Sequence, residues 1–271
     1  MNKVVVITGA ESGIGKQVAN FFRNNGNIVY SLDLEFKKQE NYYKCDVSNE
    51  NDVKNAIEDI GLKHRKIDVV INCAGYGVSG ALELIDTKKM ENIFDVNTKG
   101  IFLINKYAIK FMGKGSTIIN IASACALFPL PYRGLYCASK SAVNMLSHCY
   151  QMELKPLGIN VCSVCPGDTK TNFTKNRVKV FDTNERYKNR IANAAYSIDK
   201  NEHKRMSAEK VAKKIFKIAS KKKTKPMIII SNKMRFLYFI YKLVPLSLFL
   251  KFTEKFFGGH KHYENNPYIT N

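Results

Sequence analysis

The sequence predicts an α/β fold in which a doubly wound, parallel sheet of seven strands is covered by helices on both faces. Short apolar runs alternate with helical patterns along residues 3–230, and 45% of the 271 residues are hydrophobic, enough for one large core. The first apolar run, Val4 to Ile7, also leads directly into a glycine-rich turn. We expect a single domain over residues 1–231, followed by an amphipathic helical extension over residues 232–271.

Apolar runs of strand length define the predicted sheet. They cover residues 3–8, 27–32, 42–45, 67–72, 116–121, 159–164 and 227–230. Helices are expected to begin near Gly13, Asn49, Lys88, Gly134 and Ser207, with right-handed crossovers between the strands. Residues 168–206 form a long polar and basic connection, which is typical of a lid or binding loop.

The turn after the first strand has the spacing of a phosphate-binding loop. Its glycines follow the pattern T-G-x-x-x-G-x-G and turn the chain from a buried strand into a helix. The free backbone N–H groups and the positive dipole end of such a helix suit a pyrophosphate. The predicted phosphate-binding residues are Gly9, Ser12, Gly13, Ile14 and Gly15.

Polar residues further along the chain form a catalytic pattern. Tyr136 and Lys140 are four residues apart in a segment with helical periodicity, so both project from one face. Ser123 lies 13 residues before Tyr136, at the end of a predicted strand, and Asn97 stands in a helical segment. A nearby ammonium group favours phenolate, so Tyr136 is predicted to exchange a proton with an alcohol while Ser123 polarises the carbonyl.

Together with the glycine turn, these residues resemble the short-chain dehydrogenase/reductase family over residues 1–231. The resemblance implies a Rossmann-like fold and hydride transfer between a nicotinamide and a carbonyl carbon. In the family, the residue matching Lys140 also holds the nicotinamide ribose, and the residue matching Asn97 holds a water that links the lysine to solvent. Both roles are therefore expected here.

The resemblance also implies further cofactor contacts. Asp-Val after the third strand matches the adenine-contacting pair, Asn-Cys-Ala-Gly after the fourth matches Asn-Asn-Ala-Gly, and Pro-Gly-Asp-Thr-Lys-Thr matches the Pro-Gly-x-x-x-Thr that holds the nicotinamide amide. Cys73 departs from the second motif, and Thr169 stands where valine or isoleucine is more usual. The residues implied are Asp46, Val47, Asn72, Ala74, Gly75, Pro166, Gly167, Thr169 and Thr171, with Tyr136 and Lys140.

The end of the second strand indicates which dinucleotide binds. Asp33 lies 24 residues after Gly9, where this fold places an acidic residue on the adenosine ribose hydroxyls. A carboxylate there repels a 2′-phosphate, and the glycine turn provides no cation. NAD is the predicted cofactor, with NADP the less favoured alternative because Lys37 and Lys38 lie nearby.

The net charge of +20 is concentrated near the C-terminus. Residues 200–271 contain 17 Lys and Arg against 4 Asp and Glu, interleaved with Phe, Leu and Tyr rather than arranged for nucleic acid. Residues 233–257 are predicted to form two short helices, the second with Pro245 in its first turn and an apolar face of Leu248, Phe249, Phe252 and Phe256. Such helices lie at a membrane interface, cap an apolar cleft or form a subunit contact; a span across the bilayer is disfavoured because the apolar run is short and interrupted.

The predicted function is that of an NAD(H)-dependent oxidoreductase that interconverts a secondary alcohol and a ketone on a hydrophobic molecule. The long aromatic ending resembles family members that act on steroids, retinoids and sphingoid ketones. Two alternatives stay open: a reductase of 3-oxoacyl thioesters on an acidic carrier protein, and a dinucleotide-sensing scaffold without turnover. The resemblance also favours a homodimer or homotetramer.

The location of the protein is predicted from its first strand and its cysteines. A strand that begins at residue 3 leaves no room for a signal peptide, and the 7 cysteines are then expected to be reduced. The 5 histidines show no ligand spacing, so no metal site is expected. We therefore expect a cytoplasmic protein, with peripheral membrane contact through residues 233–257 as one of the roles open to the extension.

Overall fold

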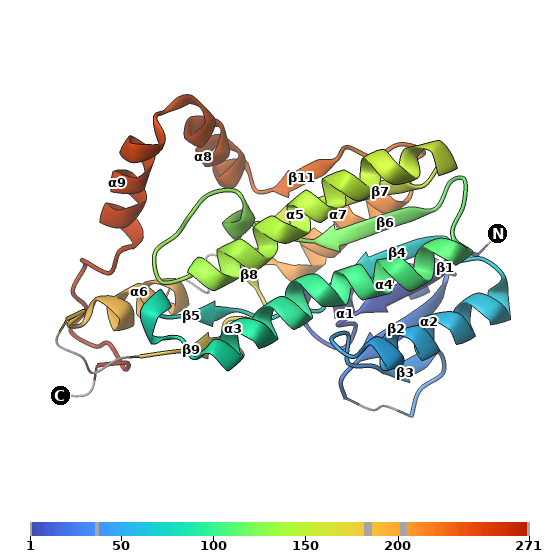
Figure 1. The fold of residues 1–271 in the computed structure, drawn as a ribbon, viewed down its shortest axis with the longest axis horizontal. Coiled ribbons are helices and arrows are strands. Elements are labelled where there is room, and N and C mark those ends of the chain that lie inside the picture. The colour runs from blue at the N-terminus through green and yellow to red at the C-terminus, as the bar shows by residue number, and fades with distance from the viewer. Residues whose placement is uncertain (1, 36–37, 182–185, 201–204, 270–271) are drawn as a thin grey trace.

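The computed structural model describes residues 2–35, 38–181, 186–200 and 205–269, and it confirms the seven-stranded parallel sheet (Figure 1). The strands lie in the order β11-β7-β6-β4-β1-β2-β3, and each begins and ends within two residues of the predicted positions. Their bounds are β1 Val4–Thr8, β2 Ile28–Asp33, β3 Tyr42–Lys44, β4 Val69–Asn72, β6 Thr117–Ile121, β7 Asn160–Pro166 and β11 Met227–Ile230.

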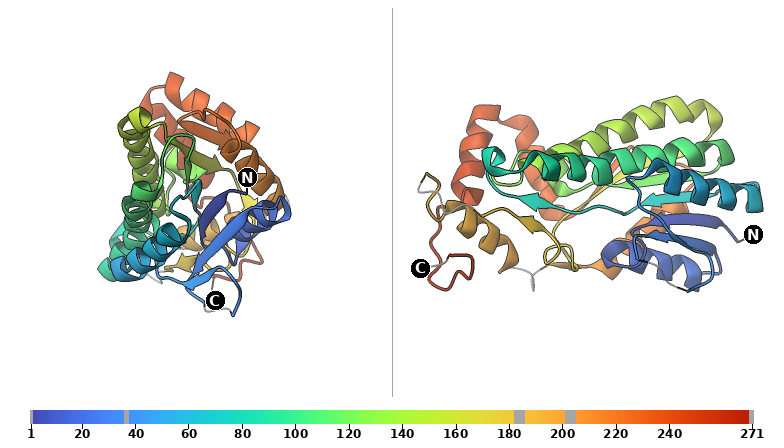
Figure 2. Two further views of the ribbon diagram at one scale, coloured as in Figure 1. Left: turned by 90° about the vertical axis from the view of Figure 1, so that its right-hand side faces the viewer. Right: turned by 60° about the horizontal axis from the view of Figure 1, so that its bottom comes forward.

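Helices cover both faces of the sheet (Figure 2). On one face lie α1 (Gly13–Asn24) and α7 (Ala208–Ala219), and on the other lie α2 (Glu50–His64), α4 (Gly100–Ala108) and α5 (Gly134–Leu154). Alternate residues of β1 enter the two cores: Val5 and Ile7 pack towards α1 and α7, whereas Val4 and Val6 pack towards α2 and α4. Burial on both faces explains why this strand is an uninterrupted apolar run.

Side-chain caps fix where several helices begin. Asn49 caps α2 by accepting hydrogen bonds from the backbone N–H groups of Asn51 and Asp52, and Ser207 caps α7 by accepting one from Lys210. Asp86 caps α3 (Thr87–Phe94) in the same way. Helix α3 continues through a π-helical turn, Asp95–Lys99, into α4. The predicted helix starts are therefore confirmed within one residue.

Residues 168–206 contain more regular structure than the sequence predicts. They include α6 (Arg190–Asp199), whose Ile191 and three alanines are buried, and two short strands, β8 (Thr169–Lys170) and β9 (Val178–Lys179). Strand β9 pairs with β5 (Val78–Ser79), and β8 pairs with β10 (Met206–Ser207). Two-residue strands form by pairing with distant segments, so no local sequence pattern predicts them.

The C-terminal extension forms the two predicted helices, α8 (Asn232–Leu243) and α9 (Leu246–Phe257). Pro245 is the N-cap of α9, one residue earlier than expected. Phe249 is buried, and its ring lies 4.8 Å from that of Tyr241 and 5.6 Å from that of Phe128. In the described part of the chain, no helix is both long enough and apolar enough to cross a bilayer.

Candidate active site

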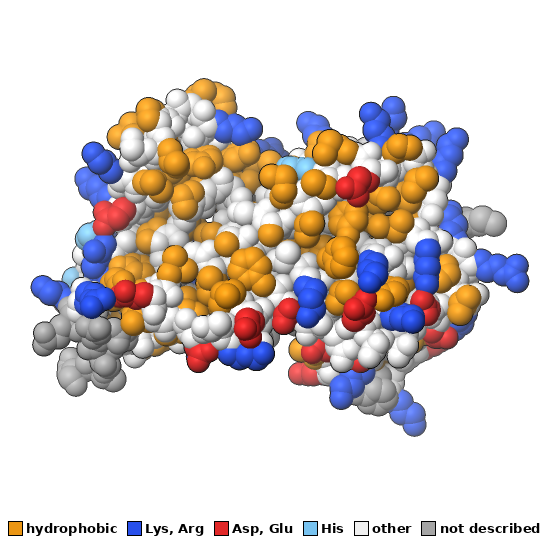
Figure 3. Space-filling view, viewed as in Figure 1, with side chains coloured by type: hydrophobic (Ala, Val, Ile, Leu, Met, Phe, Trp, Pro, Cys, Tyr) orange, Lys and Arg blue, Asp and Glu red, His pale blue; other side chains and the backbone are white. Residues whose placement is uncertain are grey.

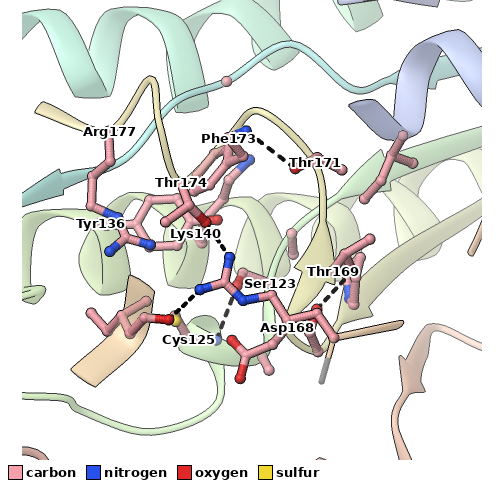
Figure 4. Close-up of a pocket in the computed structure, with 18 of the residues that line it drawn as sticks. Ser123, Cys125, Tyr136, Lys140, Asp168, Thr169, Thr171, Phe173, Thr174 and Arg177 are labelled. Carbon is pink, nitrogen blue, oxygen red and sulfur yellow. Dashed lines mark hydrogen bonds between the residues drawn. The ribbon is translucent and has the colours of Figure 1, made fainter. Parts of the chain in front are cut away.

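A cavity of about 850 Å³ lies where the main strands end (Figure 4). Its walls come from the segments that follow β1, β4, β6, β7 and β11, together with α5 and the start of α8. In an open parallel sheet this crevice is the usual ligand site. The predicted site residues that line it are Ser12, Gly13, Ile14, Gly15, Gly75, Ser123, Tyr136, Lys140, Pro166, Gly167, Thr169 and Thr171.

The glycine turn packs so closely against its neighbours that its glycines cannot carry side chains, and this leaves the backbone open to a ligand. A Cβ atom at Gly15 would lie 2.0 Å from the carbonyl oxygen of Gly9, and one at Gly13 would lie 3.3 Å from the side chain of Thr171. Gly9 itself has a φ of +62° and would place a Cβ atom 2.9 Å from the backbone of Ala74. These positions require glycine, and they direct the N-terminus of α1 into the cavity. The cradle fits the diphosphate of a dinucleotide.

Tyr136, Lys140 and Ser123 converge on one side of the cavity, as the sequence predicts (Figure 4). Tyr136 and Lys140 lie one turn apart on α5, and Lys140 Nζ donates a 2.9 Å hydrogen bond to the carbonyl oxygen of Ile121. Ser123 follows β6, where its hydroxyl oxygen accepts a 3.1 Å hydrogen bond from the backbone N–H of Cys125. This bond orients the Ser123 hydroxyl beside Tyr136.

Asn97 is fully buried behind these residues. Its amide donates to the Tyr76 carbonyl oxygen at 2.9 Å and to Ser139 Oγ at 3.0 Å, and its side-chain oxygen accepts from the Tyr76 N–H at 3.0 Å. The close approach of Gly75 to both Asn97 Oδ1 and Lys140 Nζ places the three residues together. Asn97 therefore fastens the segment after β4 to α5.

Burial governs the titration of Tyr136 and Lys140. It raises the pKa of Tyr136, as does the nearby Cys125, while Ser123 and the positive charge of Arg177 act in the opposite direction. Burial also lowers the pKa of Lys140 to about 8. The sequence predicts that Lys140 lowers the pKa of the phenol. That role of Lys140 stays a prediction, and in the structure burial outweighs the groups that lower the pKa of the Tyr136 phenol.

Several predicted cofactor residues lie outside the cavity wall. Asp46 accepts hydrogen bonds from the N–H and hydroxyl of Ser48, so it closes a turn, and Val47 packs against Gly100 of α4. Asn72 is buried, and it donates to Asn105 and Asn120. The backbone N–H of Ala74 is held by Thr8 Oγ1 at 3.1 Å.

Asp33 ends β2 beside the glycine turn, as predicted. Its carboxylate accepts a 3.0 Å hydrogen bond from the backbone N–H of Glu11 and a 2.8 Å bond from that of Leu34. The carboxylate therefore lies at the edge of the phosphate cradle. Of the two lysines near it in sequence, Lys37 lies outside the described residues.

The cavity also contains residues that no motif identifies. Arg133, Arg177 and Arg205 all line it, as do Cys125 and Phe173. A hydrogen bond from Cys137 lowers the pKa of Cys125 to about 6, with help from the Arg133 charge and against the effect of burial. The basic composition of residues 168–206 is the only sequence feature that points towards two of these arginines.

Known proteins share both this sequence pattern and this fold. The family model for short chain dehydrogenases matches residues 3–180. The chain is 35% identical to a 3-ketodihydrosphingosine reductase of Bacteroides thetaiotaomicron, over 81% of this chain and 84% of that protein. Among solved structures, a short-chain dehydrogenase from Streptomyces avermitilis covers 97% of this chain and is itself covered in full, with a TM-score of 0.80; at 20% identity this likeness concerns the fold.

A second solved structure, ElxO with NADP bound, is 29% identical and has a TM-score of 0.68, with 85% of this chain and 97% of that chain covered. Members of the matched family bind a nicotinamide dinucleotide, and the glycine cradle of this chain fits one. With the family model spanning most of the sheet and Tyr136, Lys140 and Ser123 meeting in one cavity, the chain belongs to the short chain dehydrogenase family and is an NAD(P)-dependent oxidoreductase of alcohols and ketones.

Proposed function

We propose that this oxidoreductase uses NAD(H) to interconvert a secondary alcohol and a ketone on a hydrophobic, lipid- or steroid-like molecule. The substrate class is supported by the residues that the C-terminal extension contributes to the cavity wall. Met234 and Leu237 of α8 and Phe257 of α9 line the same cavity as Tyr136. The aromatic extension therefore adds an apolar wall to the reaction site.

The proposed chemistry assigns the proton to Tyr136. Because burial favours the neutral phenol, Tyr136 is set to donate a proton to the ketone oxygen during reduction. The Ser123 hydroxyl donates a hydrogen bond to the same oxygen, and Lys140 and Asn97 hold the surrounding backbone. The bound nicotinamide supplies or accepts the hydride.

Asp33 supports NAD over NADP in this proposal. A carboxylate at the end of β2 binds two ribose hydroxyls and repels a 2′-phosphate. The predicted contacts of Asp46, Val47, Asn72, Ala74, Pro166, Gly167, Thr169 and Thr171 with the dinucleotide belong to the same proposal. In the structure the Thr169 hydroxyl donates a hydrogen bond to the Gly167 carbonyl oxygen, and the Thr171 hydroxyl oxygen accepts one from the Phe173 N–H.

Turnover of a substrate panel tests the proposal. Steroid alcohols, long-chain ketones and 3-oxoacyl thioesters would be assayed with NAD(H) and NADP(H), and we expect the hydrophobic ketones to give the highest kcat/KM. Preference for the thioesters would identify a carrier-protein reductase instead. NADH binding with no turnover of any compound would identify a sensor.

We also propose that α8 and α9 rest on an acidic membrane surface. Of the predicted apolar face of α9, only Phe249 is buried, whereas Leu248, Phe252 and Phe256 stay exposed. Figure 3 shows hydrophobic side chains gathered over these helices. The large apolar residues of α8 and α9 that are exposed are Phe236, Phe239, Leu243, Leu246, Leu248, Leu250, Phe252 and Phe256. The basic residues among them are Lys233, Arg235, Lys242, Lys251 and Lys255. Exposed aromatic and basic residues together suit a membrane interface better than bulk water.

A second exposed apolar surface supports the proposed homo-oligomer. Phe102 of α4 and Met145 and Met152 of α5 are exposed on neighbouring helices (Figure 1). Self-association would cover these side chains. Measuring the mass in solution for the native chain and for Met145→Glu tests this: a dimer or tetramer should dissociate in the variant.

A further inference from the structure

Arg177 is held in the cavity by a contact between distant parts of the chain. It directly precedes β9, and the backbone N–H of Val178 donates a 2.9 Å hydrogen bond to the Gly77 carbonyl oxygen. A Cβ atom at Gly77 would lie 3.4 Å from Arg177 Cγ and 3.2 Å from the ring of Phe173, so the arginine stem packs against this backbone. The Phe173 ring in turn lies 5.5 Å from the ring of Tyr136.

The guanidinium of Arg177 points into the same corner as the catalytic phenol (Figure 4). Arg177 and Tyr136 are close enough for the charge of each to influence the pKa of the other. Arg177 therefore lines the cavity on the same side as Tyr136.

This guanidinium is buried without a full set of partners. The Arg177 side chain is 10% exposed, and its Nη1 has no hydrogen-bond partner among the residues that the structure describes. Nη1 faces Asp199, whose Oδ1 lies 4.0 Å away and also has no hydrogen-bond partner among the described residues. The other oxygen of Asp199 is already bound by Lys179 at 2.7 Å and by the Tyr268 hydroxyl at 2.5 Å. One carboxylate thus faces two cations, so one positive charge of this group is not compensated by Asp199.

The rest of the cavity does not neutralise this charge. Among the described residues that line it, the only acidic one is Asp168. The cationic residues of the same wall are Arg133, Lys140, Arg177, Arg205 and Lys233. Arg205 donates its hydrogen bonds to uncharged oxygens, those of Thr174 and Ile198. A cavity with this balance attracts an anion.

We propose that Arg177 binds a carboxylate of the substrate close to the reacting carbon, so that the substrate is an amphiphile with an acidic end at the reaction centre and an apolar body along α8 and α9. This inference rests on the proposed function and narrows its substrate class. An arginine matches a carboxylate because its planar fork can donate two parallel hydrogen bonds. Since Arg177 and Tyr136 are neighbours, the carboxylate and the hydroxyl must be separated by only a few bonds, as in a 3-hydroxy acid.

A matched pair of substrates tests the inference. Oxidation of 3-hydroxydodecanoate and of its methyl ester would be measured with NAD, because the two compounds differ in charge and share the reacting carbon. We expect the native protein to prefer the acid by roughly tenfold or more in kcat/KM. Arg177→Gln should raise KM for the acid by a similar factor and affect the ester much less, and Arg177→Lys should restore part of the preference.

Lys175→Gln is the matched control, because Lys175 is an exposed cation two residues from Arg177 and does not line the cavity. It should change both substrates to the same small extent. Equal use of acid and ester by the native protein would overturn the inference while leaving the proposed function intact. An equal loss of kcat for both substrates in Arg177→Gln, with a displaced pH profile, would instead show that Arg177 only positions or tunes Tyr136. If neither compound nor any member of the wider panel is turned over, the proposed function itself fails.

Discussion

Lys140 is anchored to a carbonyl oxygen rather than to an acid: its Nζ donates a 2.9 Å hydrogen bond to Ile121, the last residue of β6. The side chain is almost fully buried, and burial lowers its pKa from the usual 10.5 to about 8. Below pH 8 the Lys140 ammonium is therefore charged inside the folded protein. The same charge costs less free energy in the unfolded chain, where water solvates it. This position is needed for function and is unfavourable for stability.

Lys140→Met is expected to stabilise the fold while abolishing turnover. Near pH 7 the free energy of unfolding should rise by about 1–3 kcal/mol, since a buried charge is removed and one hydrogen bond is lost. The sign follows from the lowered pKa. Between pH 8 and 10.5 the unfolded chain binds the proton that the folded protein has released, so the stability of the native protein rises with pH. The difference in free energy of unfolding between the native protein and Lys140→Met therefore becomes smaller over this range.

Urea unfolding at pH 7 and pH 9.5 checks this behaviour. Lys114→Met, at an exposed turn position, is the control and should change stability little at either pH. A lower stability of Lys140→Met at both pH values would show that the hydrogen bond to Ile121 outweighs the cost of the charge.

Tyr136→Phe tests the proton path. The variant keeps the ring and removes the hydroxyl, so kcat should fall by about 10²- to 10⁴-fold while NADH affinity stays within about twofold. Because burial raises the pKa of Tyr136, reduction by the native protein should persist through neutral pH, and oxidation should become faster as pH rises. Steady-state rates and NADH fluorescence titration measure the two properties.

Tyr132→Phe is the control for Tyr136→Phe, since Tyr132 lies near the start of the same helix but does not line the main cavity. It should retain most of the native rate. If Tyr136→Phe kept a comparable rate, another group would have to supply the proton.

The sequence predicts the strands, and the meeting of Tyr136, Lys140 and Ser123 in one cavity, because both depend on short-range spacing. Tyr136 and Lys140 meet because four residues make about one helical turn, and the strands form because both faces of the sheet are buried. Ser123 could be placed for the same reason, since it directly follows a strand that ends at the crevice. Each of these arguments needs only neighbouring residues.

The arginines of the cavity could not be placed in this way. Arg177 lines the cavity on the same side as Tyr136 because β9 pairs with β5, 100 residues earlier in the chain. Nothing in the residues around Arg177 indicates that pairing. The sequence also could not predict that Leu248 and Phe256 are exposed, because amphipathicity shows that a helix has an apolar face and does not show what covers it.

Asp33→Ala tests the choice of dinucleotide. The substitution removes a charged acceptor at the ribose position, so we expect NADH to bind about 10- to 100-fold more weakly. NADPH should gain relative to NADH, because the repulsion of its 2′-phosphate is lost with the carboxylate. Dissociation constants of both cofactors, for the native chain and the variant, give the answer.

The backbone contact of Asp33 needs its own control. Asp33→Asn keeps an acceptor for the Glu11 N–H, so it separates the effect of charge from that of loop geometry. If both variants lose NADH affinity equally, the charge is responsible. A native chain that already prefers NADPH would contradict the proposed role of Asp33.

The exposed surface of α8 and α9 predicts binding to acidic vesicles. Phe236 is 66% exposed and Phe256 is 65% exposed, so Phe236→Glu together with Phe256→Glu should leave the fold intact, whereas a change at the buried Phe249 would not. We expect the native chain to sediment with vesicles that contain phosphatidylserine and to be released as salt screens the basic residues. The double variant should bind at least about tenfold more weakly, since it loses apolar contact and adds negative charge.

Leu62→Glu is the matched control, because Leu62 is equally exposed but lies on α2, away from α8 and α9 (Figure 1). Its vesicle binding should equal that of the native chain. Equal weakening by Leu62→Glu would indicate a general effect of charge rather than a membrane surface on the extension. If the native chain does not bind vesicles at all, the mass of the Phe236→Glu and Phe256→Glu variant in solution distinguishes the two remaining roles. A smaller mass would show a subunit contact, and an unchanged mass with a higher KM for bulky substrates would show a cap on the cavity.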